Sequence, residues 1–165
     1  MTPEEAKELA RLLGKVARSG YYFPDPAFQA LHGVVSMWAP ELVIAREGAR
    51  GKEVLLTKYK GGAAAFKGKW HIPGGYNTWS DSGLDETCDR IAKRELGVGV
   101  KYKKTLDVYR WMADEHPYGR PLSLFVECDL LGEIKENNEM RFFSKDALQE
   151  NIVPCHRRFL DTYFV

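Results

Sequence analysis

Several features that would assign this sequence to a special class of protein are missing from it. No apolar run approaches the roughly 18 residues that a membrane-spanning helix needs. The formal net charge at pH 7 is only +1, which argues against binding nucleic acid through bulk charge. No repeat, low-complexity tract or long linker interrupts the chain. What remains is the composition of an ordinary globular protein, with 44% hydrophobic and 28% charged residues.

Cysteine is also scarce. The chain has three cysteines, Cys88, Cys128 and Cys155, which are widely spaced and include no Cys-x-x-Cys pair. This number and spacing argue against a disulfide framework and match no zinc-binding pattern. The opening segment, MTPEEAKELARLLGK, is polar and does not read as a secretory signal. We therefore expect reduced thiols in a cytoplasmic protein that contacts neither membrane nor nucleic acid.

The apolar patterns predict a fold of the α+β class, with a mixed sheet sandwiched between helices. A length of 165 residues suits one domain, here a helical extension over 1–33 followed by a core over 34–165. Helices are expected over 2–19, 84–96, 145–151 and 155–163, and a short one is opened by Asp25 and Pro26. Strands are expected over 34–45 (interrupted near Pro40), 53–59, 70–73, 100–112, 121–131 and 140–144.

The first predicted helix carries its own start and stop signals. Thr2 and Glu5 have the spacing of a capping box, and Gly20 follows the last turn. One apolar stripe runs along it, formed by Ala6, Leu9, Ala10, Leu13, Val16 and Ala17. Packing of this stripe on its own domain is the simpler interpretation, and a dimer contact or a lid is the alternative.

One carboxylate falls on an unexpected face of the helix predicted over 84–96. At about 100° per residue, one arc of roughly 140° must face the core, and it holds Leu84, Cys88, Ile91, Ala92 and Leu96. Glu95 lies inside this arc, about 20° from Leu84. A buried carboxylate is costly unless a base or a cation neutralises it. The alternatives are a structural ion pair with Arg90 or another base, a bound metal, or a helix end that bends toward water.

The surrounding stretch, PGGYNTWSDSGLDETCDRIAKRELGVGV at 73–100, resembles the Nudix box, G-x5-E-x7-R-E-U-x-E-E-x-G-U, in which U is aliphatic. The match is partial. Gly75, Arg90, Glu95 and Gly97 take their places in the box if the turn carries one extra residue.

Three other box positions have lost their acid. Ser82 takes the first-glutamate place, and Ile91 and Arg94 stand where the box has two further glutamates. A rival alignment reads Glu86 and Arg94 as the glutamate and arginine of the box, but it loses the closing glycine and both acids. The first alignment also keeps the apolar arc, so we prefer it.

This pattern of loss resembles the branch of GDP-mannose mannosyl hydrolases, which keeps the arginine and the last glutamate. The similarity extends over residues 34–165 through KGKWHIPGG, LLTKYK, RFFSKDAL and NIVPCHRRFLDTYF. The resemblance implies a Nudix fold and a Mg²⁺-dependent (or Mn²⁺-dependent) hydrolase. Its substrate would be a nucleoside diphosphate linked to a sugar or other group, with a GDP-mannose-like nucleotide sugar favoured. The resemblance also implies a homodimer.

The resemblance also implies a metal site. The carbonyl of Gly75, the carboxylate of Glu95 and a carboxylate at Glu136 match the three ligands of that branch, and all are oxygen donors suited to a hard cation. Arg90 would hold the box glutamate or a phosphate, since its fork suits both. A surface pair between Arg90 and Glu86 is the alternative.

Substrate contacts are implied for two lysines and two aromatic residues. Lys58 and Lys60 match the basic pair that meets the diphosphate, although a solvated strand end would look the same. Tyr76 and Trp79 lie on the turn, where flat rings stack on a base or a sugar. Packing over the extra residue of the turn is the alternative for both.

Two departures from the branch affect catalysis. Asn137 stands at the place of the general-base histidine, and an amide cannot take up a proton at neutral pH. Tyr76 replaces the arginine that follows the glycine pair. His116, in a loop between two strands, is the best replacement base, with a solvated loop histidine as the alternative. For His71 we expect a half-buried structural role.

Three functions are consistent with these observations. The first is the hydrolase, with Glu95, Arg90 and His116 as its catalytic residues. The second is a degenerate Nudix domain that binds a nucleotide without turning it over, suggested by Ile91, Arg94 and Asn137. The third is an interaction domain built on the helix over 2–19.

Overall fold

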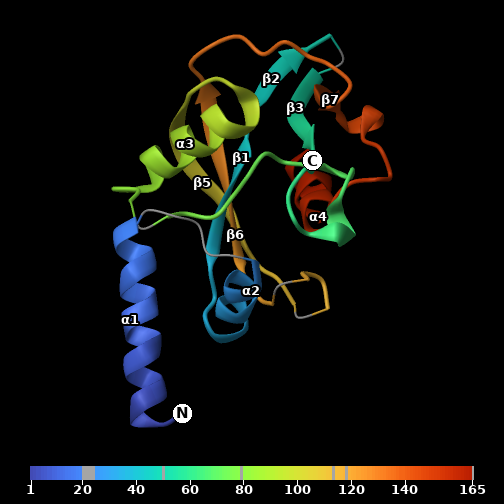
Figure 1. Ribbon diagram of the computed structural model, residues 1–165. Coiled ribbons are helices and arrows are strands. Elements are labelled where there is room, and N and C mark those ends of the chain that lie inside the picture. The colour runs from blue at the N-terminus through green and yellow to red at the C-terminus, as the bar shows by residue number, and fades with distance from the viewer. Residues whose placement is uncertain (20–24, 50, 79, 113, 118, 165) are drawn as a thin grey trace.

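The computed structural model describes residues 1–19, 25–49, 51–78, 80–112, 114–117 and 119–164. Figure 1 shows the helices α1 (Pro3–Ser19), α2 (Asp25–Val34), α3 (Leu84–Leu96) and α4 (Pro154–Tyr163). The strands are β1 (Trp38–Val43), β2 (Ala45–Gly48), β3 (Gly51–Lys58), β4 (Trp70–His71), β5 (Val100–Arg110), β6 (Leu122–Leu130) and β7 (Met140–Ser144). Single 3-10 turns lie at Ala64–Phe66 and Lys145–Ala147.

The strands form two sheets. In the first, β6 lies between β1, to which it is parallel, and β5, to which it is antiparallel. In the second, β3 pairs antiparallel with β2, β4 and β7. The chain passes from one sheet to the other at Ile44, whose carbonyl accepts a hydrogen bond from the backbone N–H of Leu55. The predicted α+β class is confirmed, and the expected mixed sheet occurs as two.

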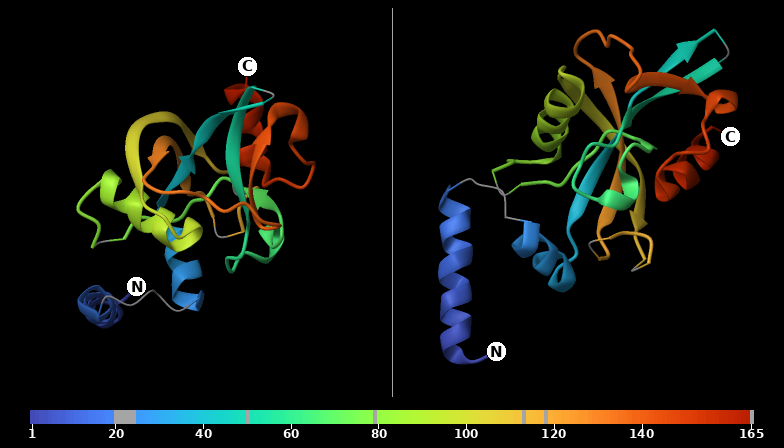
Figure 2. Two further views of the ribbon diagram at one scale, coloured as in Figure 1. Left: turned by 90° about the horizontal axis from the view of Figure 1, so that it is seen from above. Right: turned by 45° about the vertical axis from the view of Figure 1, so that its right-hand side comes forward.

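Helices α3 and α4 cover opposite sides of the strands (Figure 2). Because side chains alternate along a strand, neighbouring residues of β1 and β6 belong to different cores. Leu42 and Val126 pack with the buried face of α3, whereas Val43 and Phe125 pack with α4. The ring of Phe125 stacks on that of Phe159 in α4, with the centroids 4.0 Å apart. The alternation of side chains along β1 and β6 therefore gives each helix its own apolar face of the strands to pack against.

The prediction for α3 is confirmed at both ends. The helix covers Leu84–Leu96, and Gly97 closes it in the left-handed conformation with φ of 74°. Within the predicted arc, Leu84 is half-buried and the remaining four residues are buried, namely Cys88, Ile91, Ala92 and Leu96. The apolar period alone was sufficient to place this helix.

Two expected features differ in the structure. The strand expected over 34–45 is not interrupted at Pro40. The Pro40 carbonyl accepts a hydrogen bond from the N–H of Gly75, and the N–H that proline lacks would point to this same side, away from β6. Pairing with β6 is therefore intact. The helix expected over 145–151 is a single 3-10 turn, because residues 151–153 run alongside β4 and exchange hydrogen bonds with Trp70.

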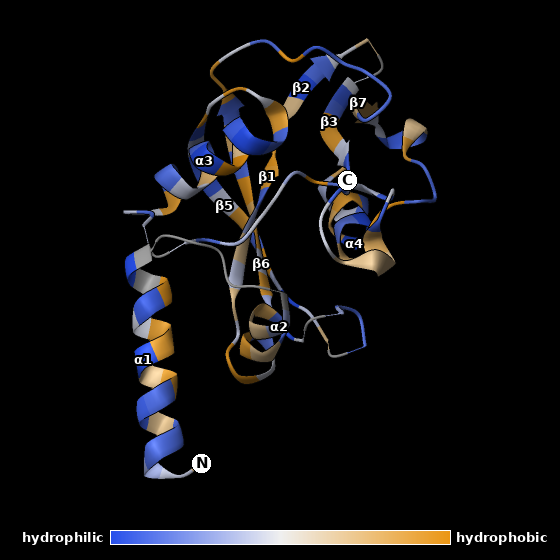
Figure 3. Ribbon diagram, viewed as in Figure 1, coloured by the Kyte–Doolittle hydropathy of each residue, from blue (hydrophilic) through white to orange (hydrophobic). Residues whose placement is uncertain are grey.

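Helix α1 has the predicted capping box but not the predicted packing. The N–H of Thr2 donates to Glu5 Oε2 at 2.6 Å, and the N–H of Glu5 donates to Thr2 Oγ at 3.2 Å. The helix stands to one side of the core (Figures 1 and 2), and its apolar stripe is visible along its length in Figure 3. Leu9 and Leu13 remain 46% and 39% exposed, so packing of the stripe on its own domain is wrong for them.

Position 20, expected to end α1, lies outside the described residues, as does the side chain of Ala17. None of the helices among the described residues is both long and apolar enough to cross a membrane.

The position of α3 depends on its buried face. Truncation of fully buried Ile91 to alanine should lower the free energy of unfolding by about 2–5 kcal/mol, because it leaves a cavity against the sheet. Urea denaturation measures this difference. Lys93→Ala, at an exposed position of the same helix, is the control and should change stability by less than about 0.5 kcal/mol. Equal effects of the two substitutions would contradict the packing described here.

Candidate active site

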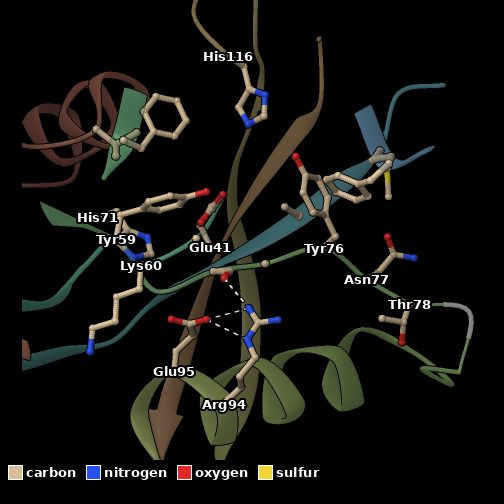
Figure 4. A pocket seen from close by; sticks show the side chains of 18 of the residues that line it. Glu41, Tyr59, Lys60, His71, Tyr76, Asn77, Thr78, Arg94, Glu95 and His116 are labelled. Carbon is tan, nitrogen blue, oxygen red and sulfur yellow. Dashed lines mark hydrogen bonds and ion pairs between the residues drawn. The ribbon is translucent and has the colours of Figure 1, made fainter. Parts of the chain in front are cut away.

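A cavity of about 650 Å³ opens between α3, the turn that follows β4, and the ends of several strands. Figure 4 shows its labelled side chains: Arg94, Glu95 and Lys60 lie at one end, Glu41 in the middle and His116 at the other end. Aromatic residues form much of the remaining wall, among them Tyr59, Phe66, Tyr76 and Trp111. The cavity therefore joins a charged end to an aromatic chamber.

The turn at Pro73–Gly75 forms one edge of the cavity by docking against β1. The N–H of Leu42 donates to the Pro73 carbonyl at 2.7 Å, and the N–H of Gly75 donates to the Pro40 carbonyl at 3.2 Å. A side chain at Gly74 would overlap Glu41 Oε2. The glycine at this position is therefore required by close approach of the turn to the strand.

At the charged end, Arg94 lies between the turn and Glu95. Its Nε and Nη2 each lie 2.9 Å from Glu95 Oε1, and Nη2 also donates to the Gly74 carbonyl at 3.2 Å. A Cβ at Gly75 would come within 2.5 Å of the same Nη2. Glu95 is partly buried, with 26% of its side chain exposed, and it lines the cavity. Its partner is thus Arg94, whereas the sequence pointed first to Arg90.

Arg90 instead holds the segment after the turn. Its Nε and Nη2 donate to the two oxygens of Asp81 at 2.7 and 2.6 Å, and Nη2 also donates to the Tyr76 carbonyl at 3.0 Å. The Asp81 carboxylate accepts further bonds from Thr78 and Thr87. The Arg90 guanidinium is the main reason that the pKa of Asp81 lies well below its usual range. Arg90 thus pairs with Asp81 rather than with Glu95 or Glu86, and its expected contact with a phosphate stays a prediction.

Glu41 lies in the middle of the cavity and is a residue that the sequence reasoning missed. It is only 6% exposed, and its Oε1 accepts a hydrogen bond from Ser123 Oγ at 2.8 Å. Burial raises the pKa of Glu41 to about 8; the bond from Ser123 opposes the shift, and the negative charge of Glu95 adds to it. The sequence signal that could have identified Glu41 is its place as the single acidic residue in the apolar run WAPELVIA.

His156 lies beside Glu41 and is fixed in one tautomer. Its Nδ1 accepts a hydrogen bond from the N–H of Ile72 at 2.9 Å, so the proton of the neutral ring is on Nε2. That Nε2 lies 3.7 Å from Glu41 Oε1. Burial lowers the pKa of His156, which keeps the ring neutral. The pair is therefore a neutral imidazole facing a carboxyl group that holds its proton at pH 7.

The two histidines considered from the sequence both line the cavity. His71 is buried rather than half-buried, and its Nε2 lies 3.1 Å from Thr57 Oγ1. His116 lies at the far end, where its ring meets that of Trp111 with the centroids 4.9 Å apart. Burial lowers the pKa of each histidine to about 4. Both rings are thus neutral at pH 7.

Two predicted site residues lie outside the cavity lining. Lys58 donates to the Gly68 carbonyl at 3.1 Å and lies 4.5 Å from the centre of the Trp70 ring, whereas Lys60 lines the cavity. Glu136 has one oxygen 2.8 Å from Arg46 Nη2, and its other oxygen accepts from the N–H of Phe142. The remaining predicted residue, Trp79, lies outside the described residues.

The expected metal site is not assembled in this structure. The guanidinium of Arg94 occupies the space between the Gly74 carbonyl and Glu95, and both oxygens of Glu136 are engaged elsewhere. Across the part of the chain that the structure describes, no group of three or more His, Cys, Asp or Glu is arranged to hold a metal. The residues present therefore do not fit the cation in the arrangement observed.

One family of known proteins matches most of the chain. The NUDIX domain model matches residues 38–163. No curated protein matches the chain in sequence.

Solved structures share the fold at low identity. A NUDIX hydrolase from Nitrosomonas europaea has a TM-score of 0.62 at 20% identity over 78% of this chain and 70% of its own. A structure described as UDP-X diphosphatase has a TM-score of 0.59 at 17% identity over 98% and 81%. The NUDIX domain of NrtR from Shewanella oneidensis, complexed with ADP ribose, has a TM-score of 0.61 at 18% identity over 99% and 97%.

The ion pair between Arg90 and Asp81 should stabilise the fold. Asp81→Asn should cost roughly 3 kcal/mol, at the low end for a buried pair because Arg90 is 28% exposed. The difference in free energy of unfolding between the wild type and Asp81→Asn should shrink in acid. The stability that a carboxyl group with a lowered pKa contributes is lost as the pH falls below its ordinary pKa of 3.8. Denaturant unfolding across pH tests both statements. The control Asp85→Asn, at an exposed position on α3, should change the free energy of unfolding by less than about 0.5 kcal/mol.

Glu41 should reduce stability as pH rises. Because its pKa is about 8 in the folded chain against an ordinary 4.5, the folded state holds the extra proton between these values and loses stability across that window. Glu41→Gln cannot ionise, so its melting temperature relative to the wild type should be higher near pH 8 than near pH 5. Thermal melts measure this. A constant difference would contradict the buried, protonated carboxyl; Glu47→Gln, on exposed β2, is the control.

Proposed function

The chain belongs to the NUDIX domain family, and from this premise we propose that it hydrolyses nucleoside diphosphate derivatives in the cavity beneath the Gly74–Gly75 turn. The observation that carries the proposal is one cavity that joins a charged end, which contains Lys60, Arg94 and Glu95, to an aromatic chamber. Its volume of about 650 Å³ falls within the range of small-molecule sites.

The two ends of the cavity suit the two parts of such a ligand. At the charged end, Lys60 and Arg94 offer ammonium and guanidinium donors to diphosphate oxygens. Along the chamber, the rings of Tyr59 and Tyr76 offer faces on which a base or a sugar can stack. The structures titled UDP-X diphosphatase and NrtR with ADP ribose, which share the fold, are consistent with this ligand class.

Two groups in the cavity are available for proton transfer at pH 7. His116 is neutral because its pKa is about 4, so its ring has a lone pair with which to orient and deprotonate an attacking water. With so low a pKa, it is a weak base. Glu41, with a pKa of about 8, holds a proton that it can donate. We propose Glu41, in the middle of the cavity, as the donor. His116 lies at the end opposite Lys60 and Arg94, and its role as the acceptor stays a prediction from the sequence.

Several finer points stay predictions. A GDP-mannose-like substrate rests on the sequence resemblance, and so do the homodimer and the cytoplasmic location. Nudix hydrolases generally use divalent metals, and a Mg²⁺ ion held by Gly75, Glu95 and Glu136 was expected here. Gly75 and Glu95 line the cavity, but Glu136 lies outside its lining and Arg94 already pairs with Glu95, so we derive no step through a metal.

A binding module without turnover is the second candidate. The pairing of Glu95 with Arg94 favours it, because the one box glutamate retained is already neutralised. The burial of Ile91, at another position where the box has a glutamate, favours it too. Such a protein would bind the nucleotide and release no product.

Lys60 and Lys58 provide a matched test of the cavity. Lys60→Ala should weaken GDP binding roughly tenfold, since it removes a charged donor to the diphosphate. Lys58→Ala should leave GDP binding unchanged, because Lys58 contacts Gly68 and Trp70 instead. Isothermal titration measures both. Equal loss in the two variants would place the ligand elsewhere.

Turnover is tested on ADP-ribose, UDP-glucose and GDP-mannose, with and without Mg²⁺. Release of a nucleoside monophosphate would place attack at phosphorus. If a nucleoside diphosphate and free sugar are released, hydrolysis in ¹⁸O-water decides, because only attack at the sugar carbon puts the label in the sugar. Binding without either product would establish the second candidate. Absence of both binding and product would contradict the proposed function.

A further inference from the structure

The guanidinium of Arg94 lies where a cation between the turn and Glu95 would lie. It contacts a backbone carbonyl, that of Gly74, and a carboxylate, that of Glu95, at 3.2 and 2.9 Å. Figure 4 shows these contacts as dashed lines below the turn. Carbonyl and carboxylate oxygens are the donors that hard metal ions prefer. The guanidinium of Arg94, a cation that belongs to the chain itself, thus occupies both of these oxygen ligands.

The charges around Arg94 leave little attraction for a divalent ion. Glu95 is neutralised by its pair with Arg94. Lys60 lines the same end of the cavity and pairs with Glu139, with its Nζ 2.6 Å from Glu139 Oε2. Mg²⁺ would have to displace the guanidinium of Arg94 from both of its partners. Since Mg²⁺ also gives up its water reluctantly, this exchange is unfavourable.

Arg94 also keeps the capacity to bind an anion. Its contacts with Glu95 and Gly74 use Nε and Nη2, whereas Nη1 makes no hydrogen bond to the described residues. The side chain is 45% exposed and lines the cavity. A guanidinium fixed on one side by a carboxylate and a carbonyl is pre-organised to donate from its other side to a phosphate oxygen.

We propose that Arg94 is the resident cation of this site and binds the diphosphate group directly, in place of a divalent metal. The inference rests on the proposed function for the identity of the ligand. It accounts for the position of Glu95, which holds the guanidinium beneath the turn, and for the engagement of Glu136 with Arg46 outside the cavity.

The first experiment is titration of the wild type with GDP, in EDTA and again in Mg²⁺. Direct binding by Arg94 predicts affinities that agree within about threefold, because no metal bridges the ligand. Binding that requires Mg²⁺ would overturn the inference and leave the proposed function standing. Arg94→Gln should lose roughly tenfold or more in affinity in EDTA, since a charged donor is removed.

The second experiment measures binding of Mn²⁺ alone by electron paramagnetic resonance, without any nucleotide. Arg94→Glu places two adjacent carboxylates beneath the Gly74 carbonyl, so it should gain a Mn²⁺ site that the wild type lacks. Arg94→Gln has no added acid and should gain none. Lys93→Glu makes the same change of charge at the neighbouring, exposed position and should behave as the wild type.

The two experiments fail in distinguishable ways. A Mn²⁺ site in the wild type that Arg94→Glu does not strengthen would overturn the inference whatever the protein binds. Absence of GDP binding under every condition, together with a Mn²⁺ site gained by Arg94→Glu, would instead contradict the proposed function and keep Arg94 as the resident cation. If Arg94→Glu does not fold, as judged by circular dichroism, the GDP titrations of the wild type and Arg94→Gln decide.

Discussion

The docking of the Pro73–Gly75 turn onto β1 fixes the rest of the site. Two backbone hydrogen bonds join the turn to Leu42 and Pro40, and Gly74 approaches Glu41 so closely that no side chain fits. This contact sets the height of the turn above α3 and hence the space into which Arg94 extends. It also encloses the Glu41 carboxyl group, and burial is what keeps a proton on that group. The docking of the turn therefore determines both the geometry of the site and the protonation of Glu41.

Two arginines of α3 then secure the segment that leaves the turn. Arg94 holds the Gly74 carbonyl, and one turn of helix earlier Arg90 holds the Tyr76 carbonyl together with Asp81. Each arginine is balanced by its own carboxylate, Glu95 or Asp81, so the site is close to electrically neutral before any ligand arrives. Helix α3 therefore presents two guanidinium groups to backbone carbonyls of this segment.

The cavity combines two kinds of side chain. An anionic ligand entering it meets the charged donor groups of Lys60 and Arg94 at one end and aromatic rings beyond. Burial lowers the pKa of His71 and His156 and keeps both rings neutral at pH 7, so neither adds positive charge to the cavity. These properties suit recognition of a nucleoside diphosphate and make the cationic side chains central to it.

The sequence alone determined the α+β class, the exact extent of α3 and its buried arc, because apolar period and a closing glycine are local signals. It also indicated that Glu95 needed a positive partner. Only the tertiary structure decided that the partner is Arg94, that Lys60 rather than Lys58 reaches the cavity, and that Glu136 turns to Arg46. It alone revealed Glu41 as buried beside His156. Those choices depend on which segments distant in sequence lie together, and periodicity along one element carries no information about its neighbours in space.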